Sequence, residues 1–162
     1  MHTKTLVVYY SLEGNTQFVA ETIAAILRAD ILKIQPQKEI NAGNFMKYLW
    51  GGRQVVMRET PTLLPLDKNP NDYDTLIIGT PVWAFTFAPP LRTFLSENKI
   101  IGKKIGLFCT HEGVPGHTLQ HMKNLLPDNQ FIGALEINLP IKKNPKKIIA
   151  AVEDWARGLR LV

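Results

Sequence analysis

Residues 4–26 read KTLVVYYSLEGNTQFVAETIAAI, and this stretch changes its pattern near the middle. Lys4 to Tyr10 is rich in β-branched and aromatic residues and shows no polar alternation after Thr5. That pattern is typical of a strand buried on both faces of a parallel sheet. From Asn15 the apolar residues recur at helical spacing. The stretch therefore predicts a strand, a loop and a helix in succession.

The same alternation continues along the chain. Further strands are predicted at residues 30–34, 76–79, 104–109 and 131–139. Helical stripes are formed by Leu91, Phe94 and Leu95, by Leu119, Met122, Leu125 and Leu126, and by Ile148, Ile149, Val152, Trp155 and Leu159. Asn144 is the predicted N-cap of the last helix, with Pro145 as its first residue. The pattern predicts an α/β fold, a doubly wound sheet of five parallel strands with helices on both faces.

Length and composition favour one ordinary globular domain over residues 1–162. The chain is 45% apolar and 20% charged, and it has no stretch as long as a membrane span and no signal-peptide pattern. We expect a cytoplasmic protein. Its single cysteine, Cys109, excludes an intramolecular disulfide and a multi-cysteine metal site, so no metal is expected.

The formal net charge of +5 permits attraction to nucleic acid, an acidic membrane or an acidic protein. The densest basic run, residues 142–147, lacks the interleaved aromatic residues that stack on unpaired bases. We expect this run to be a solvated loop before a helix, and no nucleic-acid or membrane partner.

The stretch between Gln35 and Asp72 breaks the alternation of strands and helices. Its ends are polar and its middle, residues 45–50, is apolar. A connection this long normally contains structure or function, and we predict a short helix at about Asn44 to Met57, packed over one edge of the sheet.

Three loops follow strands at the edge where doubly wound sheets bind ligands. The first loop, residues 11–16, reads SLEGNT and opens a helix, so it offers hydroxyls, a glycine and free helix N–H groups. These are the parts of a phosphate cradle, although Ser11 or Asn15 could instead only cap the helix. The loop lacks the Gly-Lys-Ser/Thr of a Walker loop and the Gly-x-Gly-x-x-Gly of a dinucleotide site.

The second loop, residues 80–90, reads TPVWAFTFAPP and is apolar where turn residues are usually polar. A flat aromatic ligand stacked on Trp83 would explain it; a core cluster or a dimer contact, involving Phe85 and Phe87, is the alternative.

The third loop, residues 109–116, reads CTHEGVPG and contains two glycines, so its backbone could approach the edge of a ligand ring. His111 is a candidate for tuning such a ligand, or a solvated loop residue. Cys109 is expected to be a small buried residue without a catalytic role.

Three motifs together resemble the flavodoxin family along essentially the whole chain. They are Tyr-Ser-x-x-Gly-Asn-Thr at Tyr10 to Thr16, Asp-Tyr-Asp-x-Leu-Ile-Ile-Gly-Thr-Pro-Val-Trp at Asp72 to Trp83, and the glycine-bearing loop after Cys109. The resemblance implies bound FMN and the sheet order 2-1-3-4-5. It also implies that the phosphate is surrounded by Ser11, Glu13, Gly14, Asn15 and Thr16, and that the isoalloxazine lies between Thr80, Pro81, Val82, Trp83 and Ala84 on one side and Thr110, His111, Glu112 and Gly113 on the other.

The chain departs from the family pattern in three respects. Glu13 stands where flavodoxins usually have Thr or Ser, and a carboxylate repels a phosphate unless its side chain points outward. The third loop lacks the tyrosine that in many flavodoxins stacks on the outer flavin face. The chain is also basic, whereas many flavodoxins are acidic.

These features leave three functions in view. The first is an electron-transfer protein that shuttles electrons between redox partner proteins through FMN, with no catalytic residue of its own. The second is an NAD(P)H-dependent quinone or flavin oxidoreductase, in which the open flavin face admits a nicotinamide and then a small acceptor. The third is a binding module without FMN, which the carboxylate of Glu13 would favour. A homodimer is compatible with the apolar second loop.

Overall fold

The computed structural model describes residues 3–39, 60–138 and 144–159. The predicted helix at Asn44 to Met57 lies outside the described residues. The described elements, in chain order, are β1 (Thr5–Tyr9), α1 (Asn15–Leu27), β2 (Asp30–Lys33), the 3-10 helix η1 (Pro70–Asp72), β3 (Thr75–Trp83), β4 (Thr86–Phe87), α4 (Pro89–Glu97), β5 (Lys104–His111), α5 (Thr118–Asn124), β6 (Gln130–Asn138) and α6 (Pro145–Gly158).

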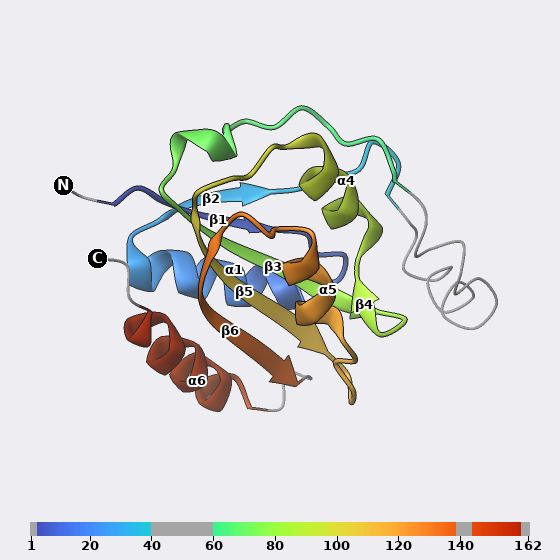
Figure 1. Ribbon diagram of the computed structural model, residues 1–162. Coiled ribbons are helices and arrows are strands. Elements are labelled where there is room, and N and C mark those ends of the chain that lie inside the picture. Colours follow the sequence, from blue (N-terminus) through green and yellow to red (C-terminus); the bar gives the residue numbers. More distant parts are fainter. Residues whose placement is uncertain (1–2, 40–59, 139–143, 160–162) are drawn as a thin grey trace.

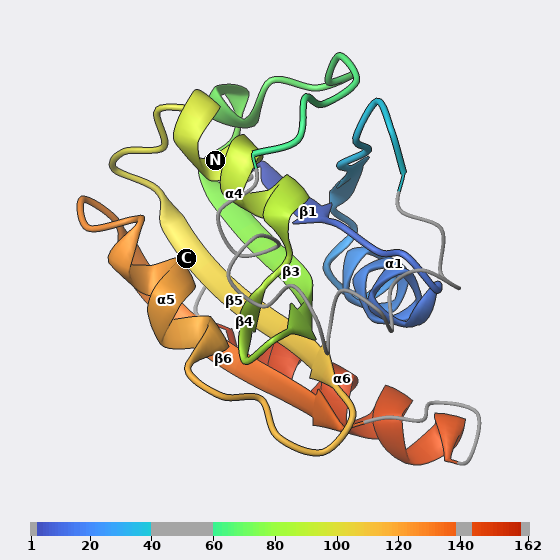
Figure 2. The same cartoon turned by 90° about the vertical axis from the view of Figure 1, so that its right-hand side faces the viewer.

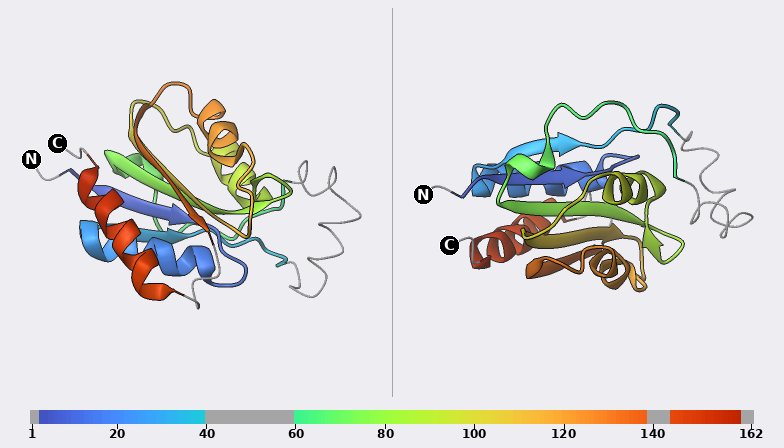
Figure 3. Two further views of the ribbon diagram at one scale, coloured as in Figure 1. Left: turned by 90° about the horizontal axis from the view of Figure 1, so that it is seen from below. Right: turned by 45° about the horizontal axis from the view of Figure 1, so that its top comes forward.

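Five strands form a parallel sheet in the order β2-β1-β3-β5-β6 (Figure 3). The predicted fold class and order are confirmed, because β5 and β6 are the fourth and fifth parallel strands. The short strand β4 is an addition to the prediction: it pairs antiparallel with the end of β3 and lies outside the main order.

Helices cover both faces of the sheet, with α4 and α5 on one side and α1 and α6 on the other (Figures 1 and 3). Alternate residues of each central strand enter the two cores, as a period of two requires. In β1, Leu6 and Val8 belong to the core that contains α4 residues, whereas Val7 and Tyr9 belong to the core that contains α1 and α6 residues. All four side chains are buried, so β1 has the doubly buried character expected from its sequence.

The predicted boundaries differ from the observed ones mainly at the carboxyl ends of strands. β3 continues four residues beyond Gly79, and β5 continues through His111. Helix α5 ends at Asn124, before Leu125 and Leu126. The last helix begins as predicted, with Asn144 at the N-cap and Pro145 in its first turn. In the described part of the chain no helix is long and apolar enough to cross a membrane.

Candidate functional site

Figure 2 looks onto the edge of the sheet where the parallel strands end. The first loop leaves β1, the second loop continues from β3, and the third loop leaves β5. Because β3 pairs with both β1 and β5, the three loops lie next to one another. The predicted site residues are therefore gathered at one edge.

The first loop leaves the start of α1 open. Gly14 is the N-cap residue with φ of 93°, a left-handed conformation that favours glycine, and it has no side chain to cap the helix. Its N–H donates to Ser11 Oγ at 3.1 Å. A Cβ placed on Gly14 would meet no heavy atom of the described residues within 4 Å. The start of α1 thus has no side-chain cap, and uncapped N–H groups at a helix start are the arrangement that binds anions.

The side chains of the first loop differ in exposure. Ser11 and Thr16 are buried, Asn15 is half-buried, and Glu13 is exposed. Water screens an exposed carboxylate, so the repulsion expected from Glu13 is weakened at this position.

A hydrogen bond joins the first loop to the third. Thr16 Oγ1, in the first turn of α1, lies 2.8 Å from Thr110 Oγ1 near the end of β5. Both threonines are 1% exposed. The link between positions 94 residues apart was not predicted, because no local pattern reports it.

Strand β5 ends two residues later than predicted, because Thr110 and His111 at the start of the third loop still belong to it. His111 is 7% exposed, and its buried Nδ1 atom forms no hydrogen bond with the described residues. Glu112 and Gly113 are exposed, and the Gly113 N–H donates to Asn138 Oδ1 at 3.4 Å. A buried, unpaired ring nitrogen is costly, so it marks a place where a partner is expected.

The second loop is a β-hairpin and not an irregular loop. β3 runs through Trp83, and β4 returns along it with Trp83 opposite Thr86. The two turn residues have positive φ, 47° at Ala84 and 65° at Phe85, as in a type I′ turn. Such turns prefer Asn-Gly, so an alanine and a phenylalanine gave no hairpin signal in the sequence.

The tip of the hairpin contacts the third loop. A Cβ added to Gly116 would lie 2.6 Å from both the Cβ and the carbonyl oxygen of Phe85, so this approach requires glycine. At the base of the hairpin, the Thr80 hydroxyl donates to the Pro81 carbonyl at 2.9 Å and accepts the Ala88 N–H at 3.0 Å. Phe85 itself is 51% exposed, whereas Pro81 and Val82 are half-buried.

Trp83 lies in the core on the α4 side and is 4% exposed. Its ring meets the Tyr10 ring edge-on, with centroids 5.5 Å apart and planes at 85°. The Tyr10 hydroxyl in turn donates to Glu39 Oε1 at 2.7 Å, and burial, followed by Glu39, raises the pKa of Tyr10. This geometry fits the core-packing alternative for Trp83; stacking of a ligand ring on the indole stays a prediction.

Cys109 is fully buried, as predicted. Burial, and secondarily the carboxylate of Glu136, raise the pKa of its thiol to about 12. The thiol is therefore protonated at neutral pH, which agrees with a packing role.

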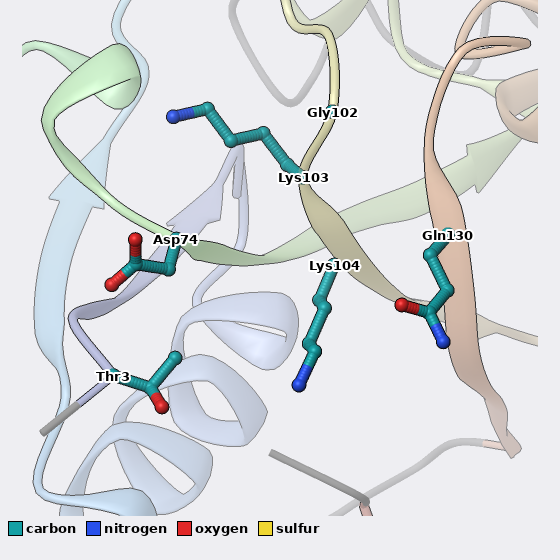
Figure 4. A pocket seen from close by; sticks show the side chains of 6 residues that line it. All are labelled: Thr3, Asp74, Gly102, Lys103, Lys104 and Gln130. Atoms are coloured by element: carbon teal, nitrogen blue, oxygen red, sulfur yellow. The ribbon is translucent and has the colours of Figure 1, made fainter. Parts of the chain in front are cut away.

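The opposite edge of the sheet contains a hollow of about 400 Å³ lined by Thr3, Asp74, Gly102, Lys103, Lys104 and Gln130 (Figure 4). Two of its charged groups have protein partners. The Lys103 ammonium donates to the Asn71 and Tyr73 carbonyls at 2.7 and 2.6 Å, and Asp74 accepts the Lys4 N–H at 2.9 Å. Its side chains also point in different directions (Figure 4). We therefore place the candidate site at the other edge.

Comparison with known sequences identifies the family. A family model described as flavodoxin matches residues 4–148. The chain belongs to the flavodoxin family. No curated protein sequence matches it. The resemblance inferred from the three motifs is thus confirmed.

Solved structures share the fold. A candidate flavoprotein from Bacteroides uniformis is 22% identical with a TM-score of 0.79, covering 97% of this chain and 99% of its own. A Lactobacillus acidophilus flavoprotein in complex with FMN is 24% identical with a TM-score of 0.66, covering 89% and 99%. The two-electron reduced flavodoxin of Megasphaera elsdenii is 21% identical with a TM-score of 0.59, covering 95% and 99%.

Proposed function

We propose that this flavodoxin-family protein binds FMN non-covalently and carries electrons between redox partner proteins. The main support for the proposal is the structure of the first loop. Helix α1 begins there without a side-chain cap, and the space beside Gly14 is open. The loop lies at the edge where such sheets bind ligands. The FMN complex of the L. acidophilus flavoprotein and the reduced M. elsdenii flavodoxin support it as relatives in fold.

The residues at this edge fit both the phosphate and the ring of FMN. The first loop offers helix N–H groups and the hydroxyls of Ser11 and Thr16 to a phosphate. At the start of the third loop, the unpaired Nδ1 atom of His111 can form a hydrogen bond with the polar edge of the flavin ring. The hairpin residues Pro81 and Val82 are half-buried and offer an apolar border to the ring.

FMN, when bound, accepts and releases one or two electrons, and the protein contributes binding, orientation and electrostatics. Such transfer requires no catalytic acid or base from the protein. The exposed side chains of Phe85 and Val114 border the hairpin and the third loop, where an apolar surface suits contact with a protein. The formal charge of +5 favours an acidic partner.

The absorption spectrum of the purified protein tests the proposal, with FMN added if the protein is colourless. Bound flavin that is reduced by dithionite but by neither NADPH nor NADH supports a carrier. Rapid anaerobic bleaching by a nicotinamide, with reoxidation by a quinone, would instead establish an NAD(P)H-dependent oxidoreductase. Absence of flavin uptake would leave a binding module and contradict the proposal. Sedimentation of the same sample reports whether the protein is a dimer.

A further inference from the structure

Thr16 and Thr110 form one hydrogen bond with each other, which uses only one of their two hydroxyl hydrogens. Each hydroxyl has a single hydrogen to donate. At 2.8 Å one oxygen donates to the other, and either can be the donor. The accepting hydroxyl keeps its own hydrogen, and the described residues provide no second acceptor to either oxygen. The remaining hydrogen therefore lacks a partner within the described residues.

The position of Thr16 determines which of the two threonines can donate the remaining hydrogen to an anion. Thr16 is the second residue of α1, directly after the open helix start at Gly14. Thr110 lies farther back, within β5. A hydrogen that remains on Thr16 is therefore the one beside an anion at the first loop.

The first loop has few other means of holding a phosphate. Its side chains between Ser11 and Thr16 are neutral or, at Glu13, negatively charged. Binding there depends on correctly directed neutral donors, since the loop itself has no lysine or arginine. A hydroxyl whose direction is fixed in advance loses less freedom on binding.

We propose that Thr110 is a positioning residue for the phosphate of FMN. Its hydroxyl donates to Thr16 Oγ1 and thereby directs the Thr16 hydrogen towards the phosphate. This inference rests on the proposed binding of FMN. Thr110 does not itself contact the phosphate. Through Thr16 it nevertheless helps the third loop to favour FMN over riboflavin.

Isothermal titration of FMN and of riboflavin into the apoprotein tests the inference. Thr110→Val keeps the shape of the side chain and removes the hydroxyl. We expect the Kd for FMN to weaken about tenfold more than the Kd for riboflavin, the loss of roughly one hydrogen bond to a charged group. Thr110→Ser, which restores the hydroxyl, should return the FMN Kd to within about twofold of the original.

The pair of threonines allows a double-mutant cycle. If Thr110 acts through Thr16, the double variant Thr16→Val, Thr110→Val binds FMN no more weakly than Thr16→Val alone. Thr93 provides the matched control, because it is 2% exposed and its hydroxyl donates to the Pro61 carbonyl at 2.9 Å, outside the three loops. Thr93→Val should leave both flavin affinities unchanged.

Three results would overturn the inference: an unchanged FMN Kd in Thr110→Val, equal weakening of FMN and riboflavin, or additive losses in the double variant. Should Thr110→Val fail to fold, Thr110→Ala is titrated with the same expectations. An original protein that binds neither flavin refutes the proposed function, whereas one that binds FMN and is insensitive to Thr110 refutes only this inference.

Discussion

The first loop and the β3–β4 hairpin lie at the same edge of the sheet but are constructed differently. In the first loop, a glycine takes the positive φ of 93°, and the polar groups face a helix start. In the hairpin, an alanine and a phenylalanine take positive φ values, and the aromatic side chain of Trp83 turns into the core. The binding groups of the first loop are thus present in its own sequence. The conformation of the hairpin instead depends on contacts with neighbouring segments.

The two regions should therefore tolerate different substitutions. Changes in the first loop should act mainly on ligand affinity, because the space beside Gly14 is open and Glu13 is exposed. Changes in the hairpin should affect stability first, because Trp83 and Phe87 belong to a buried cluster.

The largest effect is expected from Thr16→Asp. A carboxylate about 4 Å from a phosphate charge costs about 4 kcal/mol at an effective dielectric constant of 20, roughly a thousandfold in Kd. FMN binding should be lost and riboflavin binding weakened far less, because only FMN brings a phosphate charge to this buried position, whereas any loss of stability affects both flavins. Titration with both flavins measures this. Unchanged FMN affinity would contradict the placement of the phosphate at the first loop.

Trp83→Ala should act on the fold. Removing a buried indole costs about 3–5 kcal/mol of unfolding free energy, measured by denaturant unfolding of the apoprotein. Trp83→Phe, which keeps an aromatic ring, should cost less. An apoprotein as stable as the original, with FMN affinity reduced by about 1–3 kcal/mol, would instead show that the indole stacks on the ligand ring.

Gly14→Ala should destabilise the apoprotein by about 1–2 kcal/mol, because a Cβ is unfavourable at positive φ. The added methyl also occupies the open space above the first loop, so FMN affinity should fall as well. Thermal unfolding and FMN titration measure the two effects separately. A loss of neither would mean that the backbone at Gly14 differs from the one described.

Ala84→Gly is the reverse exchange in the hairpin and should have the smallest effect, with the opposite sign. Glycine relieves the left-handed conformation at Ala84 but increases the entropy of the unfolded chain, leaving a net gain of about 0.5–1 kcal/mol. The melting temperature should rise slightly with little change in FMN affinity. A clear destabilisation would show that the methyl group of Ala84 packs in a way that its backbone angle does not reveal.

The sequence predicted the parts of the fold that depend on local periodicity. Strand β1 and helix α1 were placed within a residue or two, because burial on both faces and helical spacing are visible in residues 4–26. The five-strand order followed from a family resemblance that rests on three motifs. The edge that contains the site followed from strand order, and the structure brings the three loops together there.

The hairpin and the Thr16–Thr110 bond could not be predicted from local patterns. Ala84 and Phe85 lack the residue types that announce a two-residue turn, so tertiary contacts such as that with Gly116 determine their conformation. The two threonines are 94 positions apart, and only the folded sheet brings their hydroxyls to 2.8 Å. Whether Trp83 faces a ligand or the core likewise depends on packing.

The most direct test of the account compares the affinity of the unaltered apoprotein for FMN and for riboflavin, which differ only in the phosphate. Two hydrogen bonds to a charged group contribute about 3 kcal/mol or more together, so FMN should bind at least about a hundredfold more tightly. Equal affinities would contradict the assignment of the first loop as the phosphate cradle.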